Sequence, residues 1–423
     1  MTTLLQRFWM ALSIALAATA PALALRFTGA QTSPVMTAAL AGLAILAAGF
    51  MLSWGVEAAE EHVSRGLALA VLALITVLPE FVVDFYYAMR GGQLPDSDYV
   101  HYAAANMTGA NRMLVGLGWP VIVLLYWWRS RKRYVPLQAA NAIEICYLAL
   151  ASAYSFVLVL KQRIDAVDAV VLVVLYGIYL WRLSRLPRDD DDDDDEEEEA
   201  EVGPGAALEA LPRKRKFALM TALALVAGAV IVLEAEPFAE SLVGAATAIG
   251  VNHFFLIQWV SPLAGELPEM VIMVLFTLSL RPGHALGALV SDKINQWTLL
   301  LGALPLVYAY GAGHLVPLPL GPRQQEELFL TAAQSLFAVM LLLRLRLALP
   351  GALVLLLLFL AQVALAYWTQ ADEAQTIRYL TGFAWAYIAM GTVLAGLHAK
   401  RLFGYLQFGL GLSKVASEDV GDR

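Results

Sequence analysis

Long apolar runs separated by short polar loops recur along the whole chain of 423 residues. A helix that crosses a membrane needs roughly 17–25 mostly apolar residues. Runs near that length lie at 8–25, 34–56, 65–89, 100–127, 136–160, 166–183, 217–235, 243–280, 284–312, 326–348, 350–369 and 376–398. The run 243–280 is long for one span and contains Pro262 and Pro268, so it predicts one bent helix or a helix preceded by a short segment. The pattern predicts eleven or twelve spans in an all-α polytopic membrane protein.

The composition supports this class. Hydrophobic residues make up 60% of the chain, the mean hydropathy is +0.66, and only 15% of the residues are charged. A soluble domain carries about 25% charged residues, so we expect the chain to lie in a lipid bilayer. The formal charge of −8 arises from one acidic run, Asp189 to Glu199, and the rest is mildly basic. Nothing here suggests a nucleic-acid partner, and the single cysteine, Cys146, cannot form an internal disulfide.

Basic residues predict the orientation, because they favour the cytoplasmic ends of spans. If residue 34 begins outside, every strong basic cluster is cytoplasmic: 129–133, 181–188, 212–216, 343–346 and 400–401. Residues 1–33 fit a signal peptide or an extra helix, and both interpretations stay open. We expect a monomer in the inner (plasma) membrane of a bacterium.

A polar region at 184–216 divides the chain into two halves, 34–183 and 217–369, followed by an extra helix and tail at 370–423. Its acidic run repels itself and has no apolar surface to bury, which predicts a disordered cytoplasmic loop. A calcium-sensing loop is the alternative, although the glycine and fixed ligand spacing of an EF-hand are absent from the sequence.

The two halves share a motif. Leu-Pro-Glu occurs at 78–80 and again at 267–269, each time inside an apolar run. Downstream, Asn111 aligns with Asn295 and Gly118 with Gly302. Because an odd number of helices separates the starts of the halves, the second copy enters the membrane upside down. The sequence therefore predicts two inverted-topology repeats of about five helices each, an arrangement that builds midplane sites in secondary transporters.

The motif supplies oxygen ligands. Proline has no N–H, so the carbonyls of Ile75 and Ala264 lose their helical partners, and Glu80 and Glu269 add carboxylates. Calcium takes six to eight oxygens at about 2.3–2.6 Å. Nearby polar side chains complete the predicted metal-ligand set: Thr76, Thr108, Asn111, Glu266, Ser291, Asp292 and Asn295.

These residues resemble the α-repeats of the cation/calcium exchanger superfamily, which includes the sodium/calcium exchangers. The resemblance covers both repeats and the cytoplasmic middle loop. It implies ten core helices, alternating access, and exchange of Ca²⁺ for Na⁺ or H⁺, with no cofactor. By position, the family's paired glutamates correspond to Glu80 and Glu269. Its threonine corresponds to Thr76, its serine to Ser291, and its next-helix amides to Asn111 and Asn295.

The chain also departs from the family pattern. Val77 and Glu266 replace the serine before Pro-Glu, Gly265 replaces its threonine, and Met107 stands at the first-repeat serine unless Thr108 takes that role. Arg112 and Lys293 add cations beside the predicted ligands, either facing away or pairing with the carboxylates.

Two functions follow from these alternatives. The first is a cation antiporter in which Ca²⁺ and its counter-ions compete for Glu80 and Glu269. The second is a non-transporting scaffold or sensor whose site glutamates are tethered by Arg112 and Lys293. No nucleophile–base pair, phosphate loop or zinc spacing is visible in the sequence, so we do not expect an enzyme. Asp84, Glu144 and Glu240 are weaker candidates for a role in the site.

Overall fold

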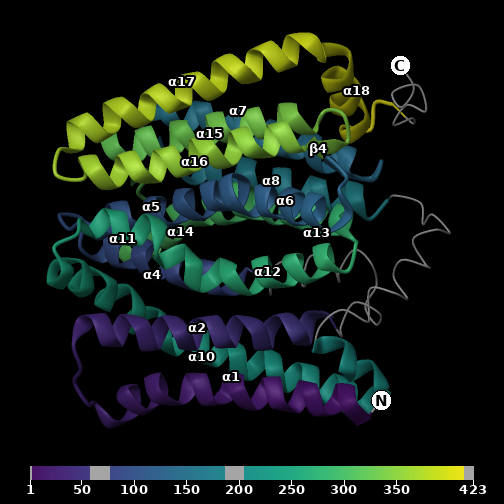
Figure 1. The fold of residues 1–423 in the computed structure, drawn as a ribbon. Coiled ribbons are helices and arrows are strands. Elements are labelled where there is room, and N and C mark those ends of the chain that lie inside the picture. The colour runs from purple at the N-terminus through teal and green to yellow at the C-terminus, as the bar shows by residue number, and fades with distance from the viewer. Residues whose placement is uncertain (1, 58–76, 186–203, 414–423) are drawn as a thin grey trace. The chain divides into compact units, whose positions relative to one another are not determined.

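The computed structural model describes residues 2–57, 77–185 and 204–413 (Figure 1). Nearly all of these residues are helical, as the apolar runs predict, because a helix satisfies every backbone group inside lipid. Nine helices in the described ranges are long and apolar enough to cross a membrane. The first part of the predicted span 65–89 and the acidic run 189–199 lie outside the described residues.

The chain divides into two compact units. Unit 1 comprises Met1–Tyr86 and Leu186–Leu275, and unit 2 comprises Tyr87–Arg185 and Phe276–Arg423. Each unit therefore takes segments from both sequence halves. The divisions fall inside helices α4 (Leu78–Gln93) and α12 (Ser261–Leu278), the two helices that carry Leu-Pro-Glu.

Unit 1 is built on three long helices, α1 (Thr2–Thr28), α2 (Pro34–Glu57) and α10 (Arg213–Ile249), with the short 3₁₀ helix η3 (Gly205–Ala210). Their shared core includes Phe8, Met51, Leu208 and Ile231. Small residues on α2 bring the backbones close, since the side chain of Phe238 lies directly over Gly42. Close packing of this kind drives helix association in lipid, where apolar burial between helices contributes little.

One predicted boundary in unit 1 is wrong. The sequence suggested separate segments at 217–235 and 243–280, but α10 runs unbroken to Ile249 with Pro237 inside it. Two glutamates in the gap between these predicted segments have partners: Arg26 pairs with Glu236 at 3.0 Å, and the Tyr86 hydroxyl donates to Glu240. The break comes at Gly250, whose φ of +72° suits glycine, and α11 (His253–Trp259) and α12 follow.

Unit 2 contains the remaining spans. From the first half come α5 (Tyr99–Met113), the π-helical turn η2 (Leu114–Gly118), α6 (Trp119–Ser130), α7 (Asn141–Lys161) and α8 (Ala166–Leu183). From the second come α13 (Pro282–Asn295), the π-helical turn η4 (Gln296–Leu300), α14 (Leu301–Ala312), α15 (Pro322–Leu342) and α16 (Leu349–Thr369).

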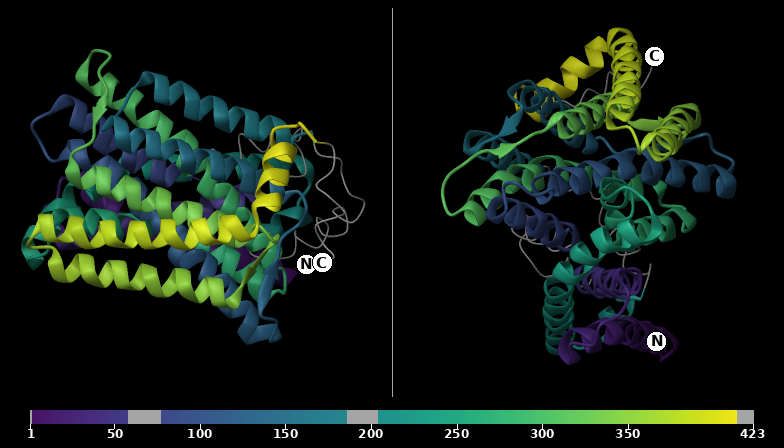
Figure 2. Two further views of the ribbon diagram at one scale, coloured as in Figure 1. Left: turned by 90° about the horizontal axis from the view of Figure 1, so that it is seen from above. Right: turned by 90° about the vertical axis from the view of Figure 1, so that its left-hand side faces the viewer.

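The C-terminal helices α17 (Glu373–Leu397) and α18 (Ala399–Gly409) complete this unit. Helix α17 packs on α15 and α16, and it runs beside α16 in both figures of the fold (Figures 1 and 2). Helix α18 packs on α7, where the Cys146 side chain lies against Gly409.

Two short antiparallel strand pairs connect the loops of unit 2. Strand β1 (Tyr134–Pro136) pairs with β4 (Arg346–Ala348), so that Val135 lies opposite Leu347. Strand β2 (Arg163–Ile164) pairs with β3 (Leu318–Pro319). Each pair joins one loop from the first half to one from the second, so the halves are fastened at the loops as well as by helix packing.

The approach of α4 to α14 gives a test of this packing. A Cβ atom at Gly311 would overlap the carbonyl oxygen of Met89, whereas no atom of the described residues lies within 4 Å of the equivalent atom at Gly177 on α8. We expect Gly311→Ala to lower the free energy of unfolding by about 1–3 kcal/mol, the usual cost of overpacking. Thermal unfolding in detergent measures the effect, with Gly177→Ala as the matched control. Equal melting temperatures for the two variants would contradict this packing.

Candidate cation site

The two Leu-Pro-Glu segments both lie in unit 1, but their prolines occupy different helical positions. Pro79 is in the first turn of α4, which begins at Leu78 in the described part of the chain. Pro268 lies inside α12, so the carbonyl of Ala264 lacks its usual amide donor. The corresponding carbonyl of Ile75, and the predicted ligand Thr76, fall outside the described residues.

Glu80 approaches the second-repeat helix at Gly265. A Cβ atom added to Gly265 would overlap the Glu80 carboxylate at Oε1, so only glycine leaves room for this contact. The Glu80 side chain is 5% exposed, Glu266 is 1% exposed and Glu269 is partly buried. The absence of the family's threonine at position 265 thus has a physical cause. Unit 1 brings the Glu80 carboxylate from one repeat against the Pro-Glu helix of the other.

A second close contact fixes α12 in unit 1. A Cβ atom at Gly49 of α2 would lie 2.7 Å from the ring of Pro268. Pro268 therefore serves as a packing surface for α2 as well as an interruption of hydrogen bonding. The proline of the second motif, Pro268, and the glutamate of the first, Glu80, therefore each contact a glycine on a neighbouring helix.

The predicted amide ligands lie in unit 2, near the ends of equivalent helices. Asn111 is in the last turn of α5, shortly before the π-helical turn η2, and Asn295 is the last residue of α13, before η4. Single π-helical turns are rare in proteins and often occur at functional sites. Their recurrence after both asparagines supports the repeat alignment made from the sequence.

Asn111 is buried and its amide is oriented. Its Nδ2 donates to the carbonyl of Met107 at 2.9 Å, while its Oδ1 accepts no hydrogen bond from any described residue. Thr108 lies one turn earlier and its hydroxyl donates to the carbonyl of Ala104 at 2.8 Å. The Asn111 side chain therefore offers an oxygen, the atom that hard cations prefer.

The predicted ligands on α13 have other contacts inside unit 2. The hydroxyl of Ser291 hydrogen-bonds that of Tyr179 on α8 at 2.8 Å, and Asp292 accepts from Gln296 at 3.3 Å. Asn295 is buried. The contact between Ser291 and Tyr179 joins residues far apart in the chain, and no local pattern in the sequence signals it.

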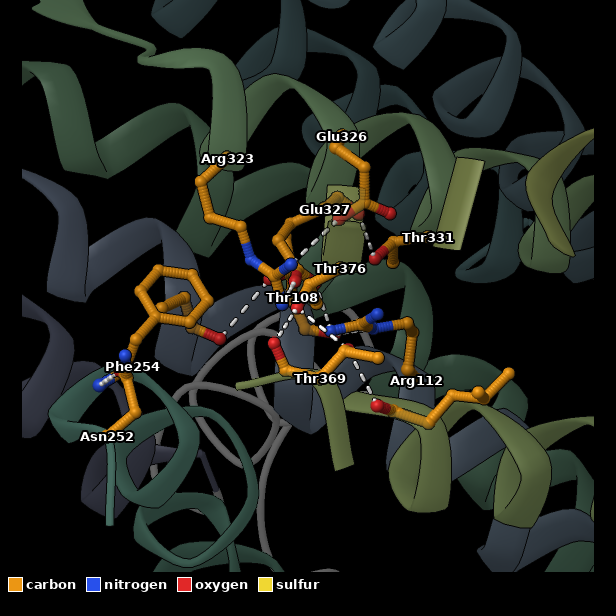
Figure 3. Close-up of polar contacts among 12 residues, drawn as sticks. Thr108, Arg112, Asn252, Phe254, Arg323, Glu326, Glu327, Thr331, Thr369 and Thr376 are labelled. Carbon is orange, nitrogen blue, oxygen red and sulfur yellow. Dashed lines mark hydrogen bonds and ion pairs between the residues drawn. The ribbon is translucent and has the colours of Figure 1, made fainter. Parts of the chain in front are cut away.

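The two cations that depart from the family pattern lie in distinct surroundings. Arg112 forms an ion pair with Glu327 of α15, and both side chains are fully buried (Figure 3). The Lys293 ammonium donates to the backbone carbonyl of Asn111 at 3.3 Å and lies 4.6 Å from the centre of the Trp297 ring. Lys293 thereby connects α13 to α5, in contact with the backbone of the candidate ligand residue itself.

Sequence reasoning did not include Glu327 among the candidate residues. The sequence does contain a signal for this ion pair, because Arg112 and Glu327 are residues of opposite charge within the apolar runs 100–127 and 326–348. Among the weaker candidates, Asp84 is fully buried on α4, and Glu144 accepts from Asn141 at 2.7 Å. Glu240 accepts from Tyr86, as described above.

Comparisons with known proteins agree with these features. The sequence profile of a family described as sodium/calcium exchanger protein matches residues 33–185 and 219–368. A solved structure, "Crystal Structure of H+/Ca2+ Exchanger CAX", is 35% identical, with a TM-score of 0.87. That match covers 97% of this chain and 100% of the other.

Two more distant structures show the same fold. "Structure of native YfkE" is 11% identical, has a TM-score of 0.63, and covers 85% of this chain and 99% of its own. A structure of the sodium-calcium exchanger NCX_Mj is 15% identical, has a TM-score of 0.52, and covers 78% and 98%. No curated protein sequence matches the chain.

The contact at Gly265 can be tested by cation binding. We expect Gly265→Ala to displace the Glu80 carboxylate and to weaken cation binding, measured as the rise in melting temperature on adding Ca²⁺ in detergent. Gly228→Ala on α10 is the matched control, because among the described residues its Cβ atom would meet just the Leu78 side chain, at an ordinary 3.7 Å. The same Ca²⁺ response in both variants and in the unmodified protein would show that this contact does not shape the site.

Proposed function

The chain belongs to the sodium/calcium exchanger family, and on that premise we propose that it is a secondary-active cation antiporter that exports Ca²⁺ in exchange for H⁺ or Na⁺. One observation carries the proposal: the Glu80 carboxylate of the first repeat lies against Gly265, in the Pro-Glu helix of the second. Carboxylates inside membrane helices are costly and mark ion pathways. Members of the family transport ions and need no cofactor.

Glu80 and Glu269 are the central ligands in this proposal. Two carboxylates neutralise one Ca²⁺, and when Ca²⁺ leaves, two monovalent cations restore neutrality before the site crosses the membrane. Ca²⁺ and its counter-ions therefore use the site in alternation, which couples the two fluxes. Glu266 and Asp292 add negative charge, and Thr76, Thr108, Asn111, Ser291 and Asn295 are the proposed neutral ligands.

The free oxygen of the Asn111 amide supports its place in this set. The hydrogen bond from Nδ2 to the Met107 carbonyl already orients this amide, so the side chain loses little conformational entropy when a cation binds to its oxygen. Asn295 has the equivalent place in the second repeat, so the inverted topology predicts that the two amides act at the same depth.

We propose H⁺ ahead of Na⁺ as the counter-ion. The 35% identical structure is titled an H⁺/Ca²⁺ exchanger, and that match covers nearly all of both chains. The likeness to the sodium-calcium exchanger rests on 15% identity and supports the fold alone.

The second candidate function is the non-transporting scaffold or sensor. It uses Arg112 and Lys293 as tethers for the site glutamates, yet Arg112 pairs with Glu327 inside unit 2, and Lys293 donates to the backbone carbonyl of Asn111. That ion pair favours the antiporter.

We also propose that the protein acts as a monomer in the bacterial inner membrane. Residues 1–33 are then an extra helix, because Phe8 and Leu12 of α1 belong to the core of unit 1. The predicted loop 184–216 connects the halves 34–183 and 217–369 on the cytoplasmic side, but its described C-terminal part is ordered: η3 carries Leu208 into the core of unit 1, and α10 begins at Arg213. Residues 370–423 are an added helix and tail.

Neutral replacements test the two glutamates. We expect Glu80→Gln and Glu269→Gln each to lower Ca²⁺ uptake into proteoliposomes by about 100-fold or more, because removing one member of a buried charge pair costs about 2–5 kcal/mol. Both variants should still fold, as judged by a single elution peak. Glu236→Gln is the control, since that side chain is 52% exposed and pairs with Arg26. Full uptake in either site variant would remove that glutamate from the ligand set.

The counter-ion is tested with separate gradients. We expect a pH gradient to drive Ca²⁺ uptake into proteoliposomes at zero membrane potential, and a sodium gradient at constant pH to give little. Uptake driven only by sodium would reverse the order of the counter-ions. No response to either gradient, together with no Ca²⁺-dependent rise in melting temperature, would favour the scaffold or sensor.

A further inference from the structure

Arg112 raises an electrostatic problem for a calcium site. It is adjacent to Asn111 on α5 and has no exposure to solvent. A guanidinium stays charged under all physiological conditions. In a low-dielectric interior its repulsion of a divalent cation would be strong and poorly screened. A transporter with this residue needs a way to hold its charge away from the ion.

The side chain of Arg112 runs back along its own helix. Its Nε lies 3.4 Å from the carbonyl oxygen of Thr108, one turn earlier, which is the direction that long side chains take on a helix. Gln334 of α15 donates to the backbone carbonyl of Arg112 at 3.4 Å. Successive residues on an α-helix point about 100° apart, so the direction of Arg112 toward α15 turns the Asn111 side chain to a different side.

Glu327 holds the guanidinium at the end of this path. Its Oε2 pairs with Arg112, and its Oε1 pairs with Arg323 at 2.6 Å (Figure 3). Arg323 also lies 3.7 Å from Glu326. Two cations and two carboxylates thus form one buried group whose formal charge is zero, which we call the α5–α15 charge group (Arg112, Arg323, Glu326 and Glu327).

We propose that Glu327 is a positioning residue for Ca²⁺ binding: it neutralises Arg112 and holds its side chain on α15, so that Asn111 can bind a divalent ion although a cation is its neighbour in the chain. This inference rests on the proposed function. Glu327 itself touches no transported ion in this scheme. It acts through Arg112, and its loss leaves a buried cation next to the candidate ligand.

Four variants test the proposal, assayed for the KM of Ca²⁺ uptake in proteoliposomes and for the Ca²⁺ concentration that half-saturates thermal stabilisation in detergent. We expect Glu327→Gln to raise both by about tenfold or more, because Arg112 loses its counter-charge. Arg112→Gln should leave both near the unmodified values. The double variant Arg112→Gln/Glu327→Gln should return both to within about threefold of them, since the uncompensated cation is gone.

Glu236→Gln is the control, because Glu236 is an exposed carboxylate on α10 that pairs with Arg26 and is not part of the α5–α15 charge group. Its values should stay within about twofold of those of the unmodified protein. If Glu327→Gln fails to fold, Glu327→Asp replaces it. The shorter side chain keeps the charge but retracts from Arg112, and an intermediate rise in both values is expected.

The outcomes distinguish a positioning role of Glu327 in Ca²⁺ binding from a purely structural role of its ion pair with Arg112. Rescue by the double variant supports the proposal, because a purely structural ion pair would lower the melting temperature without a recoverable change in Ca²⁺ affinity. Unchanged Ca²⁺ values in Glu327→Gln, or values in the double variant no better than in Glu327→Gln, would overturn the proposal while leaving Ca²⁺ transport standing. An unmodified protein that neither transports Ca²⁺ nor is stabilised by it would refute the proposed function and this inference together.

Discussion

A glutamate carboxylate pressed against the backbone of another helix is the interaction on which the candidate site depends. Glu80 lies over Gly265, where any larger residue would displace it. A carboxylate in a membrane helix is stable only where protein or an ion surrounds it. The contact brings Glu80 to the helix that carries Glu269. The same contact therefore buries the first glutamate and places it beside the Pro-Glu helix of the second repeat.

Glycine occurs at several positions where a helix of one repeat closely approaches a helix of the other. Gly49 admits the ring of Pro268 in unit 1, and in unit 2 a Cβ atom at Gly92 would overlap the carbonyl of Tyr308. Lipid tails are as apolar as leucine, so helices in a membrane gain little from burying leucine against leucine. They associate by close backbone contact instead. The glycines are therefore as important to the placement of the glutamates as the Leu-Pro-Glu motif itself.

The sequence predicted the helices and the repeats well because both depend on local patterns. An apolar run must be helical in lipid. Two copies of Leu-Pro-Glu, whose glutamates precede Asn111 and Asn295 by 31 and 26 residues, reveal an internal repeat without any structure. The continuous helix α10 was missed for a related reason. Glu236 and Glu240 look like loop residues until Arg26 and Tyr86 are seen beside them. Contacts between residues far apart in the chain decide such cases, and single-sequence patterns do not contain them.

The two extra cations show how a repeat protein becomes asymmetric. Asn111 corresponds to Asn295, so Arg112 corresponds to Gln296, and Lys293 corresponds to Gly109. Each cation is thus present in only one repeat. Arg112 directs its charge out to α15, whereas Lys293 extends from α13 to the carbonyl of Asn111 on α5. Both contacts act on α5, the first-repeat helix: one draws the Arg112 side chain toward α15, and the other places the Lys293 ammonium on the backbone of Asn111.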